Sequence, residues 1–206
     1  MGSTISSSSS PIKYSVEYPE SLSRGTLILK TLFGIFYVGI PHGIILGLYG
    51  SAVGIVQLIA FWAILFTGKF PKGMFDFVIP YLRWWLRVKS YMIMFNDKYP
   101  PFNGDENVDY PTKITVDYPE NLSRGTLILK VLFGWAYVGI PHGIILMFYG
   151  IAVAITQIIT WWSILLYAKF PKSFFDFTVS YFRWYLRVTA YMSFFTDIYP
   201  PFNGEE

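Results

Sequence analysis

The fold is decided by one long apolar stretch, residues 25–68, which reads GTLILKTLFGIFYVGIPHGIILGLYGSAVGIVQLIAFWAILFTG. Lys30 is the only charged residue in it. A single helix needs about 20 apolar residues to cross a hydrocarbon core of about 30 Å. Because residues 25–68 are about twice that long, they predict two transmembrane spans joined by a turn.

Glycines near the middle of the stretch are expected to supply the turn, because glycine adopts backbone conformations that other residues avoid; they are Gly47, Gly50 and Gly54. The predicted spans are residues 27–48 and 51–68. A turn near Gly50 places Lys30 and Lys69 at one interface, each about 29 Å from the turn at 1.5 Å per residue. The positive-inside rule then predicts that both termini of the chain are cytoplasmic.

The whole unit occurs twice in the chain. Residues 13–104 align without a gap on residues 113–204, and about two-thirds of the aligned positions are identical. The second hairpin therefore has predicted spans at residues 127–148 and 151–168. Between the copies, residues 105–112 are acidic and contain a proline, which is typical of a short polar linker.

A single crossing per unit is the alternative, in which Pro41 ends a short surface helix and one span runs from His42 to Thr67. One crossing would invert the second copy, yet the second copy repeats the basic pattern of the first, so we favour two parallel hairpins. Residues 1–12, rich in serine, are predicted to be a disordered polar tail. Alternating residues before each hairpin are compatible with two short strands, residues 13–18 and 113–118.

A more polar segment follows each hairpin, at residues 73–95 and 173–195. Asp76, Arg83 and Arg87 fall on one narrow stripe at 100° per residue, and aromatic residues lie on the other faces. This pattern predicts an amphipathic helix in the plane of the headgroups. The predicted fold class is an all-α integral membrane protein with two parallel repeats, each a transmembrane hairpin followed by an interfacial helix.

Composition agrees with a membrane protein. The chain is 53% hydrophobic, 20% aromatic and 14% charged, whereas soluble domains average about 25% charged residues. The net charge is only +3 and the basic residues flank the apolar runs, which argues against nucleic acid as a partner. The lack of cysteine excludes disulfides. Since no phosphate-binding loop or nucleophile with a histidine base is found, the sequence predicts no enzyme activity.

The sequence also resembles a known family. The resemblance rests on four motifs: the run Trp62–Pro71, the pair Arg83-Trp84, the segment Tyr99–Phe102 and the triplet Ile40-Pro41-His42. Together they are similar to bacterial membrane proteins catalogued as domain of unknown function 4389, here in two tandem copies. The resemblance covers nearly all of both copies. It implies a membrane fold and a prokaryotic source, and it implies no catalytic residues.

The two histidines of the chain, His42 and His142, lie inside predicted spans, where ionisable groups suggest a function. Gln57 is as far after the predicted turn as His42 is before it, so a hairpin predicts a hydrogen bond between them. Gln157 would pair with His142 in the same way. The alternative is that the two histidines converge to bind a cofactor such as haem, or to relay protons. No cofactor is otherwise expected.

Basic residues at the predicted interface are expected to anchor the protein to anionic lipids; they are Lys30, Lys69, Arg83, Arg87, Lys130, Lys169, Arg183 and Arg187. The second copy replaces small and charged residues of the first by aromatic residues, which are enriched at protein interfaces. We therefore expect partner contacts at Trp135, Trp161 and Phe174.

These observations predict a non-catalytic accessory or structural subunit of a larger complex in the bacterial inner membrane. Its partners would be other integral membrane subunits and anionic lipids. Two alternatives stay open: a cofactor-binding or proton-relay membrane protein that uses the histidines, and a lipid-organising membrane protein. Visible absorption of the purified protein separates the haem alternative from the others.

Overall fold

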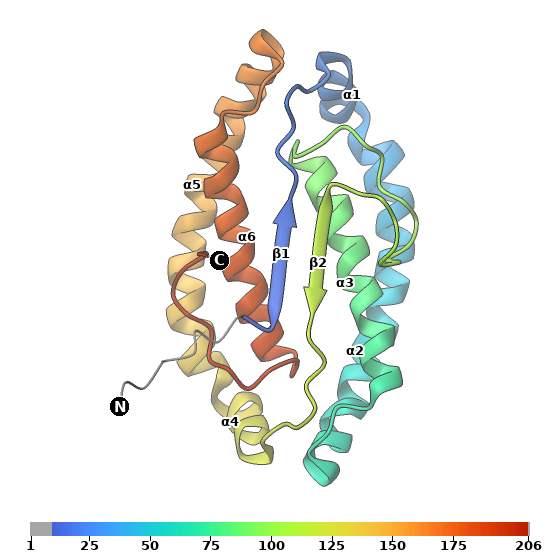
Figure 1. Cartoon of the computed structure of the whole chain (residues 1–206), viewed down its shortest axis with the longest axis vertical. Coiled ribbons are helices and arrows are strands. Elements are labelled where there is room, and N and C mark those ends of the chain that lie inside the picture. The colour runs from blue at the N-terminus through green and yellow to red at the C-terminus, as the bar shows by residue number, and fades with distance from the viewer. Residues whose placement is uncertain (1–9, 206) are drawn as a thin grey trace, which may run out of the picture.

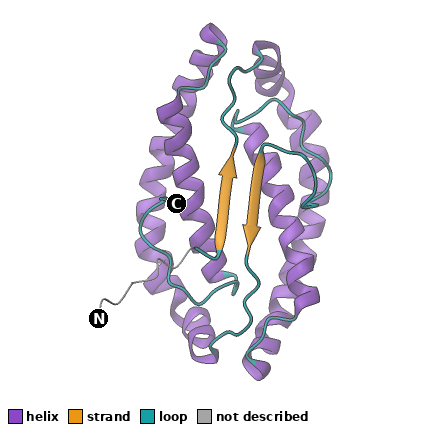
Figure 2. Cartoon of the chain, viewed as in Figure 1, coloured by secondary structure: helices purple, strands orange, loops and turns teal. Residues whose placement is uncertain are grey.

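The computed structural model describes residues 10–205, so residues 1–9 of the predicted tail and residue 206 lie outside the described part. The first repeat contains β1 (Ile12–Val16), α1 (Arg24–Gly34), α2 (Ile40–Thr67) and α3 (Lys72–Met92). The second contains β2 (Thr112–Val116), α4 (Arg124–Gly134), α5 (Ile140–Tyr167) and α6 (Lys172–Met192). The chain is mostly helical, as predicted, but the two strands correct the all-α class (Figure 2).

Each apolar stretch forms one long helix instead of a hairpin. A short π-helical segment (Ile35–Gly39, and Trp135–Gly139 in the second repeat) joins α1 to α2 and α4 to α5. The helices are therefore continuous from Arg24 to Thr67 and from Arg124 to Tyr167. The predicted turn, and with it the division into two spans per repeat, is wrong.

The glycines do not break the helix because their local cost is small. A glycine inside a helix costs about 1 kcal/mol relative to alanine, whereas unpaired backbone groups in apolar surroundings cost several kcal/mol each. Gly50 instead allows α3 to approach, because a Cβ at this position would lie 3.0 Å from the hydroxyl oxygen of Tyr81. Gly50 is thus a site of helix packing, and none of the three glycines reverses the chain.

The π-helical segment lies just before Pro41, which does not end the helix as the alternative topology required. Proline lacks the amide hydrogen that would bond the carbonyl four residues earlier, here that of Tyr37. The Tyr37 carbonyl instead accepts a hydrogen bond from the hydroxyl of Tyr99 at 2.8 Å. A π-bulge and a side-chain donor together accommodate the proline.

The two repeats are antiparallel, which corrects the prediction of parallel copies. The backbone N–H of Leu22 donates to the carbonyl of Ala168, and the N–H of Leu122 donates to the carbonyl of Gly68, both at 2.8 Å. Figure 1 shows the consequence: the start of each long helix lies beside the end of the other, at opposite ends of the molecule. The two repeats are therefore related by an approximate two-fold axis.

The two strands pair with each other across the repeats. They form an antiparallel sheet with Tyr14 opposite Ile114, which confirms the strands suggested by the alternating pattern. β1 packs on α6 and β2 packs on α3, so each strand covers a helix of the other repeat. The predicted tail must end before Ile12, because this residue begins β1.

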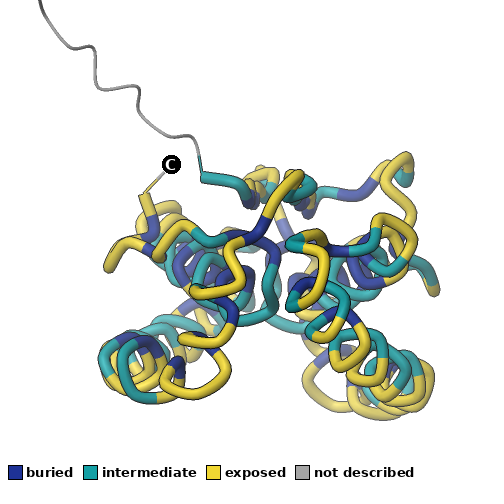
Figure 3. The backbone as a smooth tube through the Cα atoms, turned by 90° about the horizontal axis from the view of Figure 1, so that it is seen from below, coloured by how far each residue is buried: buried dark blue, intermediate teal, exposed yellow. Residues whose placement is uncertain are grey.

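The helices α3 and α6 form the middle of three layers. Seen along the long axis, the sheet lies on one outer side, and the long helices lie on the other (Figure 3). Their observed bounds agree with the predicted amphipathic segments to within three residues. Each of these helices packs against a long helix and against a strand, and their position in the headgroup plane stays a prediction.

The predicted linker is also part of the packed structure. Tyr110 is 1% exposed; its hydroxyl donates to the carbonyl of Lys98 at 2.9 Å and lies 3.2 Å from the carbonyl oxygen of Arg87. Thr112, at the end of the predicted linker, begins β2. The segment therefore fastens the second repeat's strand to the first repeat's α3.

Candidate functional site

A fully buried histidine occupies each repeat. His42 accepts a hydrogen bond at Nδ1 from the indole Nε1–H of Trp84 at 2.9 Å. Its Nε2 lies 3.2 Å from the hydroxyl oxygen of Tyr99. The ring of Phe102 stacks on the imidazole with centroids 3.9 Å apart. The second repeat has the same arrangement around its own histidine, formed by His142, Trp184, Tyr199 and Phe202.

These hydrogen bonds assign the tautomer of the imidazole. Indole nitrogen only donates, so Nδ1 of His42 is an acceptor and carries no proton. The Tyr99 hydroxyl donates to the Tyr37 carbonyl, so its oxygen accepts from Nε2–H. Both nitrogens of a neutral ring are thereby satisfied, and no lone pair is left for a metal or haem iron. A proton on Nδ1 would face the Trp84 N–H, which opposes a proton relay through this ring.

The structure does not bring His42 and Gln57 together, because both lie on one continuous helix. Their separation of 15 positions corresponds to about 22 Å along the helix axis. The Oε1 atom of Gln57 is buried without a hydrogen-bond partner among residues 10–205. Gln157 donates to the hydroxyl of Thr178 at 3.3 Å. Nor do the histidines converge, since each ring is bonded and stacked within its own repeat.

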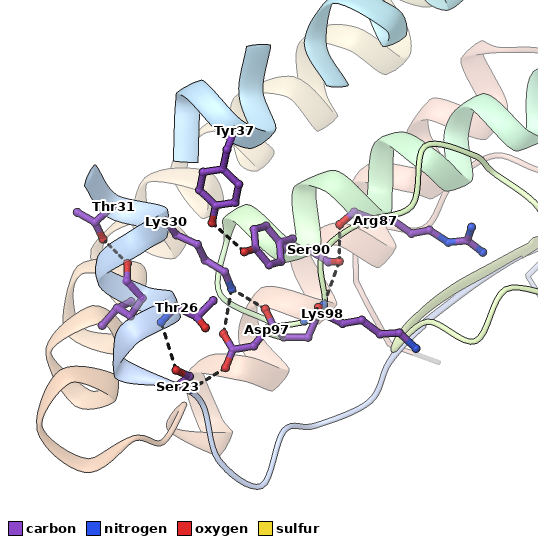
Figure 4. Close-up of polar contacts among 12 residues, drawn as sticks. Ser23, Thr26, Lys30, Thr31, Tyr37, Arg87, Ser90, Asp97 and Lys98 are labelled. Atoms are coloured by element: carbon purple, nitrogen blue, oxygen red, sulfur yellow. Dashed lines mark hydrogen bonds and ion pairs between the residues drawn. The ribbon is translucent and has the colours of Figure 1, made fainter. Parts of the chain in front are cut away.

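An ion pair ties each long helix to the segment after α3 or α6. Lys30 was expected at the lipid interface, but its side chain is 5% exposed and its Nζ lies 3.2 Å from Oδ1 of Asp97 (Figure 4). It also donates to the carbonyl of Asn96 at 2.6 Å. Lys130 and Asp197 form the same pair at 2.9 Å. The prediction that these lysines anchor lipid is wrong, because their charges are paired inside the protein.

The predicted anchoring arginines are also used inside the protein. Arg87 is 4% exposed and donates to the carbonyl of Asp105 at 2.7 Å; burial lowers the pKa of its guanidinium. Arg83 pairs with Glu106 at 2.9 Å and donates to the carbonyl of Ile114. In the second repeat, the equivalent side chains of Arg183 and Arg187 also donate hydrogen bonds to backbone carbonyls. These arginines hold strands and loops to α3 and α6.

The remaining predicted contact residues divide between surface and interior. Trp135 is 65% exposed, and its Nε1–H donates to the carbonyl of Leu132 at 3.1 Å. Trp161 donates its Nε1–H to the Thr31 hydroxyl in α1 at 2.8 Å, so it joins the two repeats. Phe174 packs against the core. The two predicted anchors that are exposed are Lys69 and Lys169.

A further exposed feature is the outer face of the two long helices. In the most apolar window of each helix, only 17% of the residues are buried. Large apolar side chains at least 60% exposed recur along the first helix, among them Leu32, Phe36, Leu48, Ile55, Leu58 and Phe66. By length and composition, both helices could cross a membrane. We call this surface the outer apolar face; it comprises the exposed residues of α1, α2, α4, α5 and the π-helical segments.

The fold and the site define a class of protein: a mostly helical chain of two repeated units, each with one long apolar helix and one enclosed histidine. The chain belongs to the family described as Domain of unknown function (DUF4389), whose model matches residues 29–103 and 129–203. The two matches confirm the predicted family and the tandem duplication. No curated protein and no solved structure matches the chain.

Proposed function

We propose that this protein is a non-catalytic membrane protein that serves as an accessory or structural subunit of a larger bacterial membrane complex. One observation carries the proposal: the outer apolar face runs along both long helices without an exposed charge between Arg24 and Lys69. Soluble monomers rarely expose contiguous apolar patches larger than a few hundred Å². Lipid, or a partner subunit within lipid, would remove this surface from water.

The interior supports a scaffold in preference to an enzyme. The imidazoles are saturated by Trp, Tyr and Phe side chains, and the buried lysines are paired with carboxylates. The arginines bind backbone carbonyls of strands and loops. Each of these groups holds one part of the fold to another, so the buried polar side chains stabilise the fold.

A lipid-organising role is the second candidate. Exposed lysines follow the end of each long helix, where the outer apolar face stops; they are Lys69, Lys72, Lys169 and Lys172. Basic residues beside an apolar surface attract anionic headgroups, each by about 1 kcal/mol. This arrangement suits a protein that gathers anionic lipid around itself without a protein partner.

Membrane fractionation tests the proposal. Leu48→Glu combined with Leu58→Glu places two charges on the outer apolar face, and Lys13→Glu with Lys113→Glu is the matched control on the sheet. We expect the wild type and the control to require detergent for extraction and the outer-face variant to be lost from the membrane. Extraction of the wild type by salt alone would contradict the proposal.

Native electrophoresis with mass spectrometry then separates the two roles. Stoichiometric membrane subunits that co-purify with the chain, and are lost from a Trp135→Ala variant, support an accessory subunit. A particle that contains only this chain and enriched anionic lipid supports the lipid-organising role. A visible absorption band of the purified protein would contradict both roles and restore the haem alternative.

A further inference from the structure

The long helices do not fit upright in a bilayer. The 44 residues from Arg24 to Thr67 extend about 66 Å at 1.5 Å per residue, against a hydrocarbon core of about 30 Å. A tilt of about 60° would be needed to keep this length in the core, and transmembrane helices tilt by about 0–40°. No exposed charge inside the helix marks a point at which it could leave the lipid, because Lys30 is buried.

The sheet lies at the wrong place for an upright molecule. In Figure 1, β1 and β2 are level with the middle of the long helices along the long axis of the molecule and do not lie beyond their ends. Lys13 and Lys113 are exposed on these strands, and Glu106 and Asp109 are exposed in the segment before β2. An upright molecule would hold these charges at the depth of the hydrocarbon, at about 2.5–3.5 kcal/mol or more for each charge near the centre.

Both ends of the molecule carry the same charge. Arg24 donates to the carbonyl of Leu166, so its end of the molecule also carries Lys169 and Lys172. The opposite end carries the equivalent residues of the other repeat, Arg124, Lys69 and Lys72. The positive-inside rule disfavours a crossing protein with equal basic clusters on both sides. If the approximate two-fold axis is parallel to the membrane normal, the two ends of the molecule lie on the same side of the membrane, and equal basic clusters are then expected.

The layers place apolar and charged surfaces on opposite sides. In Figure 3, the sheet is the layer farthest from the long helices, with α3 and α6 between them. The whole molecule is therefore amphipathic in the manner of a surface helix, whose apolar face enters a membrane while its polar face stays in water. The approximate two-fold axis runs from one surface to the other.

We propose that the protein lies flat in one leaflet of the membrane, with its long axis in the membrane plane. The outer apolar face contacts the acyl chains of a leaflet that contains anionic phospholipid, and the sheet faces water. The lysines at both ends then lie at the level of the headgroups on the same side, where they contact phosphate. This orientation rests on the membrane location proposed above.

Single-cysteine labelling tests the orientation, because the chain contains no cysteine of its own. The variants are Lys69→Cys and Lys169→Cys at the two ends, Lys13→Cys on the sheet and Ile55→Cys on the outer apolar face. Right-side-out and inside-out vesicles from expressing bacteria are treated with a membrane-impermeant maleimide. We expect both end variants and the sheet variant to react in one preparation and not in the other, and Ile55→Cys to react in neither.

The outcomes separate this inference from the proposed function. Reaction of the two end variants in opposite preparations would show that the molecule crosses the bilayer, which overturns the flat orientation and leaves the membrane role intact. Reaction of Ile55→Cys in membrane-bound protein would place the outer apolar face in water and overturn the orientation. Recovery of the wild type in the soluble fraction, including as a dimer that buries this face, would overturn both.

Discussion

The two repeats differ where a strand meets the arginines of α3 or α6. In the first repeat, Tyr110, just before β2, is buried against Arg87 of α3. Ser10 is the equivalent residue before β1, and a cavity of about 390 Å³ opens there between β1 and α6. The cavity is lined by Ser10, Ile12, Lys13, Tyr14, Ser15, Arg183, Leu186 and Arg187.

This difference shows that the duplicated unit is not a closed structural unit. The strand that covers α3 comes from the second repeat, and the strand that covers α6 comes from the first. The ring of Tyr110 is supplied by the segment between the repeats, and the equivalent position before β1 holds Ser10. The histidine and lysine sites, by contrast, are alike in both repeats because all their members come from one repeat.

Tyr110→Ser is expected to have the largest effect. It opens beside α3 a cavity like the one beside α6, and loss of a large buried aromatic side chain costs about 3–5 kcal/mol. The free energy of unfolding in detergent micelles, measured with denaturant, is the readout. Ser10→Tyr is the reciprocal change and should raise stability by filling the cavity. If Tyr110→Ser leaves stability unchanged, the segment 105–112 does not hold the repeats together.

Tyr110→Phe is the matched control and isolates the hydroxyl. Burial raises the pKa of Tyr110 to about 12 from its usual value of 10.0. The neutral hydroxyl is therefore favoured in the folded state, and this contribution is complete below pH 10 and lost as the pH rises through about 12. As the pH rises from 10 to 12, the stability of the wild type should therefore fall more than that of Tyr110→Phe, and thermal unfolding measures the difference.

Asp97→Ala and Asp197→Ala test whether the ion pairs are equivalent. Each leaves a buried lysine without its carboxylate, which costs about 3–5 kcal/mol for a fully buried pair and less here because the Asp97 side chain is 28% exposed. We expect losses of about 2–3 kcal/mol in both variants, slightly more in the second repeat, where the lysine is more buried. Asp76→Ala, in an exposed pair, should change stability by less than about 1 kcal/mol. A loss in only one of the two variants would contradict the equivalence of the two ion pairs.

His42→Phe and His142→Phe probe the enclosed imidazoles. Phenylalanine keeps the stacking on the Phe102 ring but leaves the Trp84 N–H without an acceptor. An unsatisfied buried donor costs about 1–3 kcal/mol, so we expect about 2 kcal/mol in each repeat, with the tryptophan fluorescence of the native state shifted. Retained stability combined with loss of a bound chromophore would instead indicate a cofactor site.

The sequence was sufficient for the duplication and the amphipathic helices, because each depends on local pattern or on identity between the copies. The short alternating runs only suggested the strands, and the predicted all-α class omitted them. The antiparallel packing of the repeats, by contrast, depends on contacts between distant residues, such as Leu22 with Ala168. No local sequence pattern indicates which repeat a strand will cover. Trp84 and Tyr99 were not identified from the sequence as partners of His42. Gln57 was predicted instead, because a hairpin, which does not form, would have placed His42 and Gln57 at the same depth. A usable signal existed: Trp84, Tyr99 and Phe102 recur unchanged in the second repeat.

Gly54→Ala is expected to have the smallest effect, and it tests the helix against the turn. The second repeat already has Ala154 at this position, and an added Cβ at Gly54 meets nothing within 4 Å. Alanine is favoured over glycine in a helix by about 1 kcal/mol, so Gly54→Ala should raise the thermal midpoint and Ala154→Gly should lower it by a similar amount. In a turn that needed glycine, the first change would be destabilising. A lower midpoint for Gly54→Ala, with Ala154→Gly unchanged, would therefore mean that α2 is interrupted in the first repeat and that the two repeats differ in fold.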